Sequence, residues 1–140
     1  MKYTEILSEN TKLEKQLKNK RYSIRVLSNI VVNQLGEVLE YFSRKSSVPA
    51  EVSFGDYDNV IQDSFNNTSA NLVIIFWDLS NFIDGLQYRV EMLTEGEIEE
   101  LEERIVSDVE LLFDSLRSSP LVLFNKFSSL LFNQCTPCLL

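Results

Sequence analysis

Residues 71–78 read NLVIIFWD, and this stretch is the most informative about the fold class. Between Asn71 and Asp78 every residue is apolar, with no polar side chain at alternate positions. A strand that is apolar throughout is covered on both faces, as in a parallel sheet that lies between two layers of helices. We therefore expect Ile74, in the middle of the run, to be buried in the central strand of an α/β fold.

The segments on either side of this run alternate between strand and helix patterns. Three further stretches have the composition of short strands, namely residues 23–29, 50–54 and 121–126. Four stretches place apolar residues at helical spacing, namely 4–20, 31–44, 57–66 and 94–116, whereas 79–93 fits either a helix or an ordered loop. This alternation predicts a three-layer, doubly wound parallel sheet of the flavodoxin-like type, with right-handed crossovers. Such sheets commonly have five strands, so we expect the fold to be truncated after its fourth.

The predicted helices differ in how much surface they bury. The first has only a narrow apolar stripe, so most of it is expected to face water. The last begins with Thr94 and Glu97, a capping-box pair in which each side chain bonds the other residue's backbone N–H. The residues expected to face the core in the later helices are Val32, Leu35, Leu39 and Phe42, then Val60, Ile61 and Phe65, and finally Ile98, Leu101, Ile105, Val109, Leu112 and Leu116.

A length of 140 residues suits one domain. We divide the chain into an amino-terminal charged helix (1–22), the α/β domain (23–133) and a tail (134–140). No linker or internal repeat interrupts it.

The net charge of −8 restricts the class of partner. An acidic surface repels phosphate backbones and anionic lipid, so we expect neither nucleic acid nor a membrane surface, and a basic partner suits the chain better. The polar amino terminus lacks the apolar core of a secretory signal, and no apolar run is long enough to span a bilayer. We therefore expect a cytoplasmic protein whose two cysteines stay reduced.

Histidine is absent from the chain. This absence excludes a Ser-His-Asp or Cys-His catalytic site built from this chain alone. It equally excludes a histidine-ligated zinc or iron site.

Four motifs together resemble one known family: VLSN (26–29), FGDYDNVIQDS (54–64), NLVIIFWDLSN (71–81) and PLVLFNKFSSLLFN (120–133). They are similar to the amino-terminal domain of FkbH-like proteins, which has an SGNH (GDSL-like) hydrolase fold. The resemblance covers about residues 23–133. It implies a following haloacid dehalogenase-type catalytic domain, which in some members transfers a glyceryl unit from a phosphorylated precursor onto an acyl carrier protein. The implied role of this chain is a non-catalytic recognition domain without a cofactor, which docks the carrier protein or positions that catalytic domain.

The SGNH resemblance directs attention to Ser28. In those enzymes a Gly-Asp-Ser block follows the first strand, but here Ile30 takes the place of the nucleophilic serine and Ser28 lies two residues early. Gly55 matches the oxyanion glycine, Asn81 matches the asparagine of the third block, and the Asp-x-x-His block is missing. A serine without a base is a weak nucleophile. The alternative is that Ser28 and Asn29 cap the next helix.

A second candidate is the pair Asp56 and Asp58. The stretch Asp56-Tyr57-Asp58-Asn59-Val60 matches the D-x-D-x-[TV] motif of haloacid dehalogenases, whose first aspartate attacks phosphorus while the second is the general acid and Mg²⁺ offsets charge. Here the motif follows the second predicted strand instead of the first, and no acidic pair follows a later strand. The alternative function is therefore a degenerate SGNH hydrolase or a phosphotransferase using Asp56 and Asp58. Otherwise both are acidic residues at a helix amino terminus.

Two weaker patterns complete the candidates. Asp78 and Lys126 end the third and fourth predicted strands as in receiver domains, but Ser28 and Asn29 stand where receivers hold Mg²⁺ with acids. Residues 135–138 (CTPC) form a C-x-x-C pair, yet only two residues follow, too few for the helix that lowers the pKa of a redox thiol. An unstructured tail is the alternative.

Ligands of open α/β sheets bind at the carboxyl ends of the strands. The candidate ligand-binding residues at these ends are Ser28, Asn29, Gly55, Asp56, Asp78, Asn81 and Asn125. Four aromatic residues near the third strand either line a pocket or belong to the core, namely Phe76, Trp77, Phe82 and Tyr88. Because six large apolar residues follow position 126, namely Phe127, Leu130, Leu131, Phe132, Leu139 and Leu140, we also expect self-association through the fourth strand.

Overall fold

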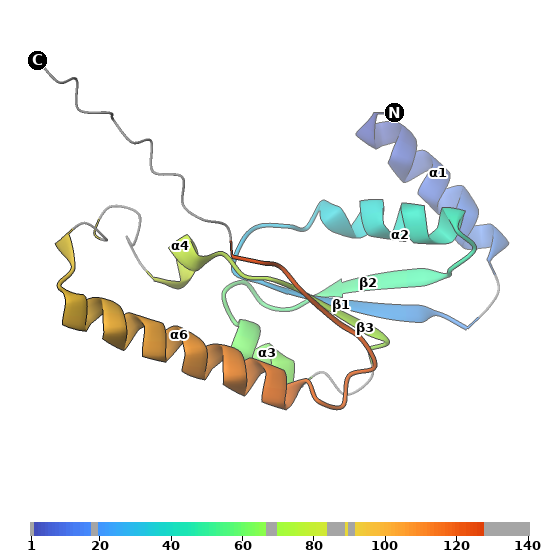
Figure 1. The fold of residues 1–140 in the computed structure, drawn as a ribbon. Coiled ribbons are helices and arrows are strands. Elements are labelled where there is room, and N and C mark those ends of the chain that lie inside the picture. Colours follow the sequence, from blue (N-terminus) through green and yellow to red (C-terminus); the bar gives the residue numbers. More distant parts are fainter. Residues whose placement is uncertain (1, 18–19, 67–69, 84–88, 90–91, 128–140) are drawn as a thin grey trace, which may run out of the picture.

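In the computed structural model, four parallel strands form one sheet in the order β2-β1-β3-β4 (Figure 1). The strands are β1 (Tyr22–Ser28), β2 (Ala50–Phe54), β3 (Leu72–Phe76) and β4 (Val122–Phe124). The structure describes residues 2–17, 20–66, 70–83, 89 and 92–127. The parallel α/β sheet agrees with the sequence, and this strand order makes β2 and β4 the two edges. The expected truncation and the division into three regions stay predictions.

Helices cover both faces of the sheet. Figure 1 shows α2 (Leu35–Lys45) on one face with α1 (Tyr3–Gln16) beside it, and α3 (Val60–Phe65) and α6 (Glu95–Ser115) on the other face. The short α4 (Leu79–Phe82) follows β3 at the carboxyl edge of the sheet. None of the described helices is long and apolar enough to cross a membrane.

Alternate residues of the strands supply two cores, one on each face. Leu27, Val73 and Ile75 pack with Leu112 and Leu116 on the α6 side. On the α2 side the buried residues are Ile24, Val26, Ala50 and Ile74, with Leu39 packed against them. The predicted burial of Ile74 is confirmed. A strand that must fill both cores has to be apolar at every position, which is the pattern of residues 72–77.

Three of the predicted core positions are wrong, because Phe42, Phe65 and Ile98 are exposed. In α2 the buried aromatic residue is Tyr41, whose hydroxyl donates to Glu9 Oε2 at 3.0 Å. A second helix, α1, packs on α2 and buries a side of α2 that does not contact the sheet. The sequence prediction assumed one apolar face on this helix, and it therefore missed the second buried side. Phe65 and Ile98 lie at or near helix ends, where the core no longer covers them.

The packing of α1 on α2 includes a buried polar contact. Most of α1 is exposed, as expected, but its buried residue is Asn10. Asn10 Oδ1 accepts a hydrogen bond from Arg44 Nη1 at 2.8 Å, and its Nδ2 donates to Glu40 Oε2 at 3.2 Å. Arg44 is itself buried and donates to the carbonyl of Ala50 in β2 at 3.0 Å. One arginine therefore joins α1, α2 and the edge of the sheet.

Candidate functional site

The polar residues at the carboxyl edge of the sheet form one hydrogen-bonded group and three separate positions. Asn29 is the best buried of them, with no exposed surface. Its side chain forms two hydrogen bonds with the backbone of Asp78, accepting from Asp78 N–H at 2.7 Å and donating to Asp78 O at 2.8 Å. Asn81 completes the group by donating from Nδ2 to the carbonyl of Asn29 at 3.1 Å. This group ties the ends of β1, β3 and α4 together.

Asn125, which follows β4, bonds the backbone just after β3. Its Oδ1 accepts from Trp77 N–H at 2.7 Å and its Nδ2 donates to Trp77 O at 3.0 Å. Two amide side chains, one just after β1 and one just after β4, thus bond the backbone N–H and C=O of two consecutive residues after β3 in the same way. Such bonds satisfy backbone groups where the ladder of the sheet has ended, so both asparagines serve the fold.

The carboxylate of Asp78 is likewise used within the chain. Its Oδ1 accepts from the backbone N–H of Ser80 at 2.9 Å and from the Ser80 hydroxyl at 2.8 Å, which caps α4. The receiver-like prediction required acidic partners at the end of β1, and that position holds the amide of Asn29.

Ser28 lies at the end of β1 and is buried. Its hydroxyl oxygen accepts from Ile30 N–H at 3.1 Å and its hydroxyl donates to the carbonyl of Ile30. The expectation that Ser28 and Asn29 cap the next helix is wrong, because α2 begins only at Leu35 and these side chains bond elsewhere. The hydroxyl closes a local turn, and without histidine in the chain no imidazole base can reach it.

Gly55 and Asp56 meet a residue that sequence reasoning missed, the buried Asp63 of α3. Asp63 Oδ2 accepts from the backbone N–H of Asp56 at 2.6 Å, and Asp63 Oδ1 accepts from Asn59 Nδ2 at 3.2 Å. A Cβ added to Gly55 would lie 2.4 Å from Asp63 Oδ2 and 2.8 Å from Leu27 Cδ2. A larger residue at this position would therefore displace the side chain of Asp63 or Leu27. The spacing of Asn59 and Asp63, one turn apart after a Gly-Asp turn, is the signal that could have indicated this bond.

Asp56 and Asp58 are both exposed in the turn between β2 and α3. Asp58 has a φ of 58°, a left-handed conformation that aspartate tolerates better than most residues, and its N–H donates to Ser28 O at 3.2 Å. This turn brings the backbone of Asp58 to the end of β1. Among the described residues, no three His, Cys, Asp or Glu side chains are grouped so that they could hold a metal ion.

Two small cavities open at this edge on either side of Ile30. One, of ≈190 Å³, is lined by Ser28, Gly55 and Tyr57, and the other, of ≈210 Å³, by Trp77, Asp78 and Asn125. Sites for small molecules usually measure about 300–1,000 Å³, so each cavity suits at most a small group. Phe76 and Trp77 both line the second cavity, although Trp77 is also buried in the core. The side chain of Phe82, Tyr88 and the C-x-x-C pair of 135–138 lie outside the described residues.

No protein-family model and no curated protein matches this chain. Among solved structures, it is similar to the crystal structure of the N-terminal part of the protein BF1531 from Bacteroides fragilis, which contains a phosphatase domain and is complexed with Mg. The TM-score is 0.70 and the sequence identity 11%. The alignment covers 97% of this chain but only 36% of the length of that chain. At this identity the similarity establishes a common α/β fold.

Proposed function

We propose that this chain is a non-catalytic interaction domain of an FkbH-like protein, which docks an acyl carrier protein or positions a haloacid dehalogenase-type catalytic domain. The observation that supports this proposal is the use of the strand-end side chains. Asn29, Asn125 and Ser28 each bond backbone groups of the chain itself, and Asp78 caps α4. A catalytic site keeps its nucleophile and base free to meet substrate, whereas these groups hold the carboxyl edge of the sheet together.

The second candidate function is phosphoryl transfer through Asp56 and Asp58. Both carboxylates are exposed at the carboxyl edge of the sheet, where ligands of this fold class bind. The protein of similar fold contains a phosphatase domain and is complexed with Mg. Against this candidate, the motif lies after an edge strand, and the neighbouring carboxylate of Asp63 is buried and bonds the turn itself.

An assay with p-nitrophenyl phosphate and Mg²⁺ separates the two candidates. We expect the wild-type chain and the Asp56→Asn variant to show the same background hydrolysis, and we expect Mg²⁺ to leave the thermal midpoint nearly unchanged. Turnover by wild type that Asp56→Asn abolishes, or a saturable rise of the midpoint with Mg²⁺ that the same variant loses, would establish the phosphotransferase instead. Asp114→Asn, which changes an exposed aspartate at the far end of α6, is the matched control.

The interaction itself is tested by calorimetric titration of the chain with a purified acyl carrier protein and, separately, with a haloacid dehalogenase-type domain of an FkbH-like protein. We expect saturable binding to one of them. Binding to neither would reject the proposal. p-Nitrophenyl acetate gives the corresponding check on the degenerate hydrolase, for which we expect no turnover that depends on Ser28.

A further inference from the structure

The outer edge of β4 offers backbone groups for another strand. On its inner side, Val73 N–H donates to Leu121 O at 2.9 Å and Asn125 N–H donates to Ile75 O at 3.2 Å. Backbone groups alternate in direction along a strand, so the N–H and C=O of Val122 and Phe124 point away from β3. Within the described part of the chain, no residue is hydrogen-bonded to these outward groups. Open edge groups of this kind are a template for strand addition.

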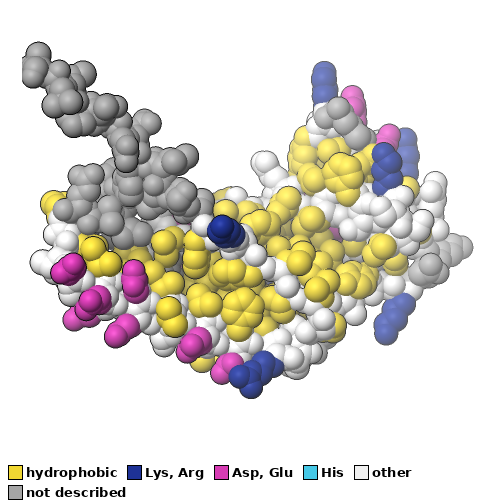
Figure 2. Space-filling model, in the orientation of Figure 1, with side chains coloured by type: hydrophobic (Ala, Val, Ile, Leu, Met, Phe, Trp, Pro, Cys, Tyr) yellow, Lys and Arg dark blue, Asp and Glu magenta, His cyan; other side chains and the backbone are white. Residues whose placement is uncertain are grey.

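Apolar side chains surround this edge on both faces of the sheet. Leu123 pairs with Ile74 and lies on the α2 side, where Leu121 and Leu123 are 47% and 49% exposed. On the other side, Phe113 of α6 packs against Phe124 with ring centroids 5.5 Å apart, and both Phe113 and Val106 remain exposed. Figure 2 shows a broad apolar area between α6 and the part of the molecule that carries α1. Contiguous apolar surface of this kind indicates an interaction site.

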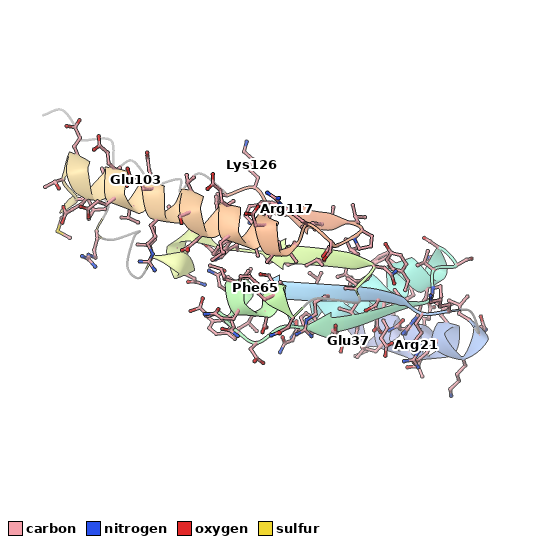
Figure 3. All side chains as sticks on the ribbon, turned by 90° about the horizontal axis from the view of Figure 1, so that it is seen from below. Arg21, Glu37, Phe65, Glu103, Arg117 and Lys126 are labelled. Carbon is pink, nitrogen blue, oxygen red and sulfur yellow. The ribbon has the colours of Figure 1, made fainter. Side chains whose placement is uncertain are left out.

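The charge next to this area is concentrated in one helix. The segment Glu95–Ser115 carries nine acidic residues and one arginine, a formal charge of −8, which equals the net charge of the entire chain. Glu102, Glu103 and Glu110 are exposed and lie three to eleven residues before Phe113, so helical spacing places them along or beside the row that faces β4. A row of acidic side chains follows the lower border of the apolar area in Figure 2, and Figure 3 labels Glu103 on this helix.

We propose that the edge of β4 and the acidic side of α6 together bind an extended segment of a partner protein that is apolar on one face and basic on the other. The inference rests on the second arm of the proposed function, in which the partner is the haloacid dehalogenase-type domain that this domain positions. The added strand pairs with Val122 and Phe124, its apolar side chains pack on Leu121 and Leu123, and its lysines or arginines reach across Phe113 toward the glutamates of α6. Lys126 is exposed after β4 and would repel a basic side chain placed beside it. The basic residues of the partner segment are therefore expected in the stretch that lies along α6.

A second copy of the chain fits this surface less well. Two β4 edges paired about a twofold axis normal to the sheet would place both α6 helices on the same face. Each helix carries a formal charge of −8, so the two acidic rows would repel one another across the new interface. A basic segment removes this repulsion and gains attraction in its place.

The test uses a fluorescein-labelled peptide of eight alternating valine and lysine residues, titrated with the full chain and followed by anisotropy. An otherwise identical valine and glutamate peptide is the control. We expect the lysine peptide to bind at least about tenfold more tightly, and the difference to shrink as salt is added. Equal binding of the two peptides would overturn the proposal.

Substitutions on and away from the proposed surface test where the peptide binds. Leu123→Lys should weaken binding by about tenfold or more, and Glu102→Gln with Glu103→Gln by several-fold. The matched controls are Val48→Lys, beside the opposite edge of the sheet, and Glu5→Gln with Glu51→Gln, which removes the same charge elsewhere. Controls that weaken binding as much as the test variants would overturn the assignment.

Amide hydrogen exchange identifies any other occupant. In the free chain the amides of Val122 and Phe124 should exchange quickly, and the lysine peptide should slow both. Protection of these amides in the free chain at every concentration would show that the chain covers its own edge, and protection that grows with concentration would show a second copy. Either result overturns the inference, while the assays of hydrolysis and of carrier-protein binding still decide the proposed function separately.

Discussion

The two edges of the sheet are built in opposite ways. At β2 two of the outward backbone groups are bonded by side chains of α2, because Glu40 Oε1 accepts from Val52 N–H at 3.0 Å and Arg44 Nη2 donates to Ala50 O at 3.0 Å. At β4, neither α6 nor any other described residue bonds the outward groups of Val122 and Phe124. Figure 3 shows the labelled residues Arg21 and Glu37 near the β2 side, and Arg117 and Lys126 near the β4 side.

The chain thus blocks part of one edge by burying a charge, whereas no described residue bonds the outward groups of the other edge. We call the β2 side the closed edge and the β4 side the open edge. Charged side chains that occupy edge groups prevent a further strand from pairing there. Arg44 is 8% exposed, so the closed edge depends on burying a charge with all of its partners in place. The open edge depends on no buried charge, and its exposed side chains are free to meet another molecule.

The largest loss of stability should follow from removing the buried arginine at the closed edge. Arg44→Met keeps much of the volume but leaves Asn10, Glu40 and the carbonyl of Ala50 without their shared donor. We expect a loss of roughly 3–5 kcal/mol in the free energy of unfolding, measured in urea, because a buried ionic group loses its partner. The control is Arg21→Met. Arg21 pairs with Glu51 at 2.6 Å, but its side chain is 69% exposed, and the loss should stay below about 1 kcal/mol. Equal losses would show that the edge of β2 is not held by the buried arginine.

Shortening a buried side chain in β3, inside the sheet, should give the next largest effect. Ile74→Ala removes a buried side chain from β3 and should cost roughly 2–5 kcal/mol in the free energy of unfolding. Leu123→Ala, at the position of β4 that pairs with Ile74, removes a side chain that is half exposed. It should cost well under half as much. A larger loss at Leu123 would mean that the open edge is covered.

The attachment of β4 to the sheet is tested by Asn125→Ala. Because β4 has only three residues, we expect the two bonds from Asn125 to Trp77 to contribute to its pairing with β3. Losing them should cost roughly 1–3 kcal/mol, the usual penalty for leaving half-buried backbone groups unpaired. The exposed Asn33→Ala is the control in the same urea experiment, and a difference near zero would show that β4 pairs without this clamp.

The smallest effect concerns the first turn of α6, the acidic helix beside the open edge. Hydrogen bonds from the backbone and then from the hydroxyl of Thr94 lower the pKa of Glu97. Because the folded pKa lies below the ordinary value of about 4.3, the contribution to stability is complete above that value. It is lost as the pH falls through the lowered folded pKa.

We therefore expect the protection factors of the Glu97 and Ile98 amides, which divide the intrinsic exchange rate by the observed one, to fall as the pH drops through the lowered folded pKa. This increment of opening should be removed by Glu97→Gln. Glu103→Gln, in the middle of the helix, should leave the increment in place. Retention of the increment in Glu97→Gln would show that the capping box does not hold the helix start.

The strands and the start of α6 could be predicted because their signals are local. The apolar run of 72–77 can satisfy two cores only as a central strand, and the bounds of β2 agree at both ends with the predicted 50–54. Thr94 and Glu97 bond one another as their spacing indicated, with Thr94 N–H donating to Glu97 Oε2 at 2.8 Å. The prediction for α2 was less accurate, because burial by α1 depends on a contact that no local pattern records.

A parallel α/β fold, polar residues at the strand ends and the impossibility of a histidine-based site built from this chain's own residues all follow from the sequence. What the polar residues do is visible only in the folded structure. Asn29 and Asn125 reach the backbone after β3 from positions about 50 residues away in the chain, and Asp63 folds back on the turn after β2. The edges of the sheet show the same limit. In the sequence, Glu40 and Arg44 cannot be distinguished from exposed charged residues of a helix, because only the fold places β2 beside them. Hydrogen bonds between residues far apart in the chain depend on how whole helices and strands pack, and a local sequence pattern carries no information about that packing.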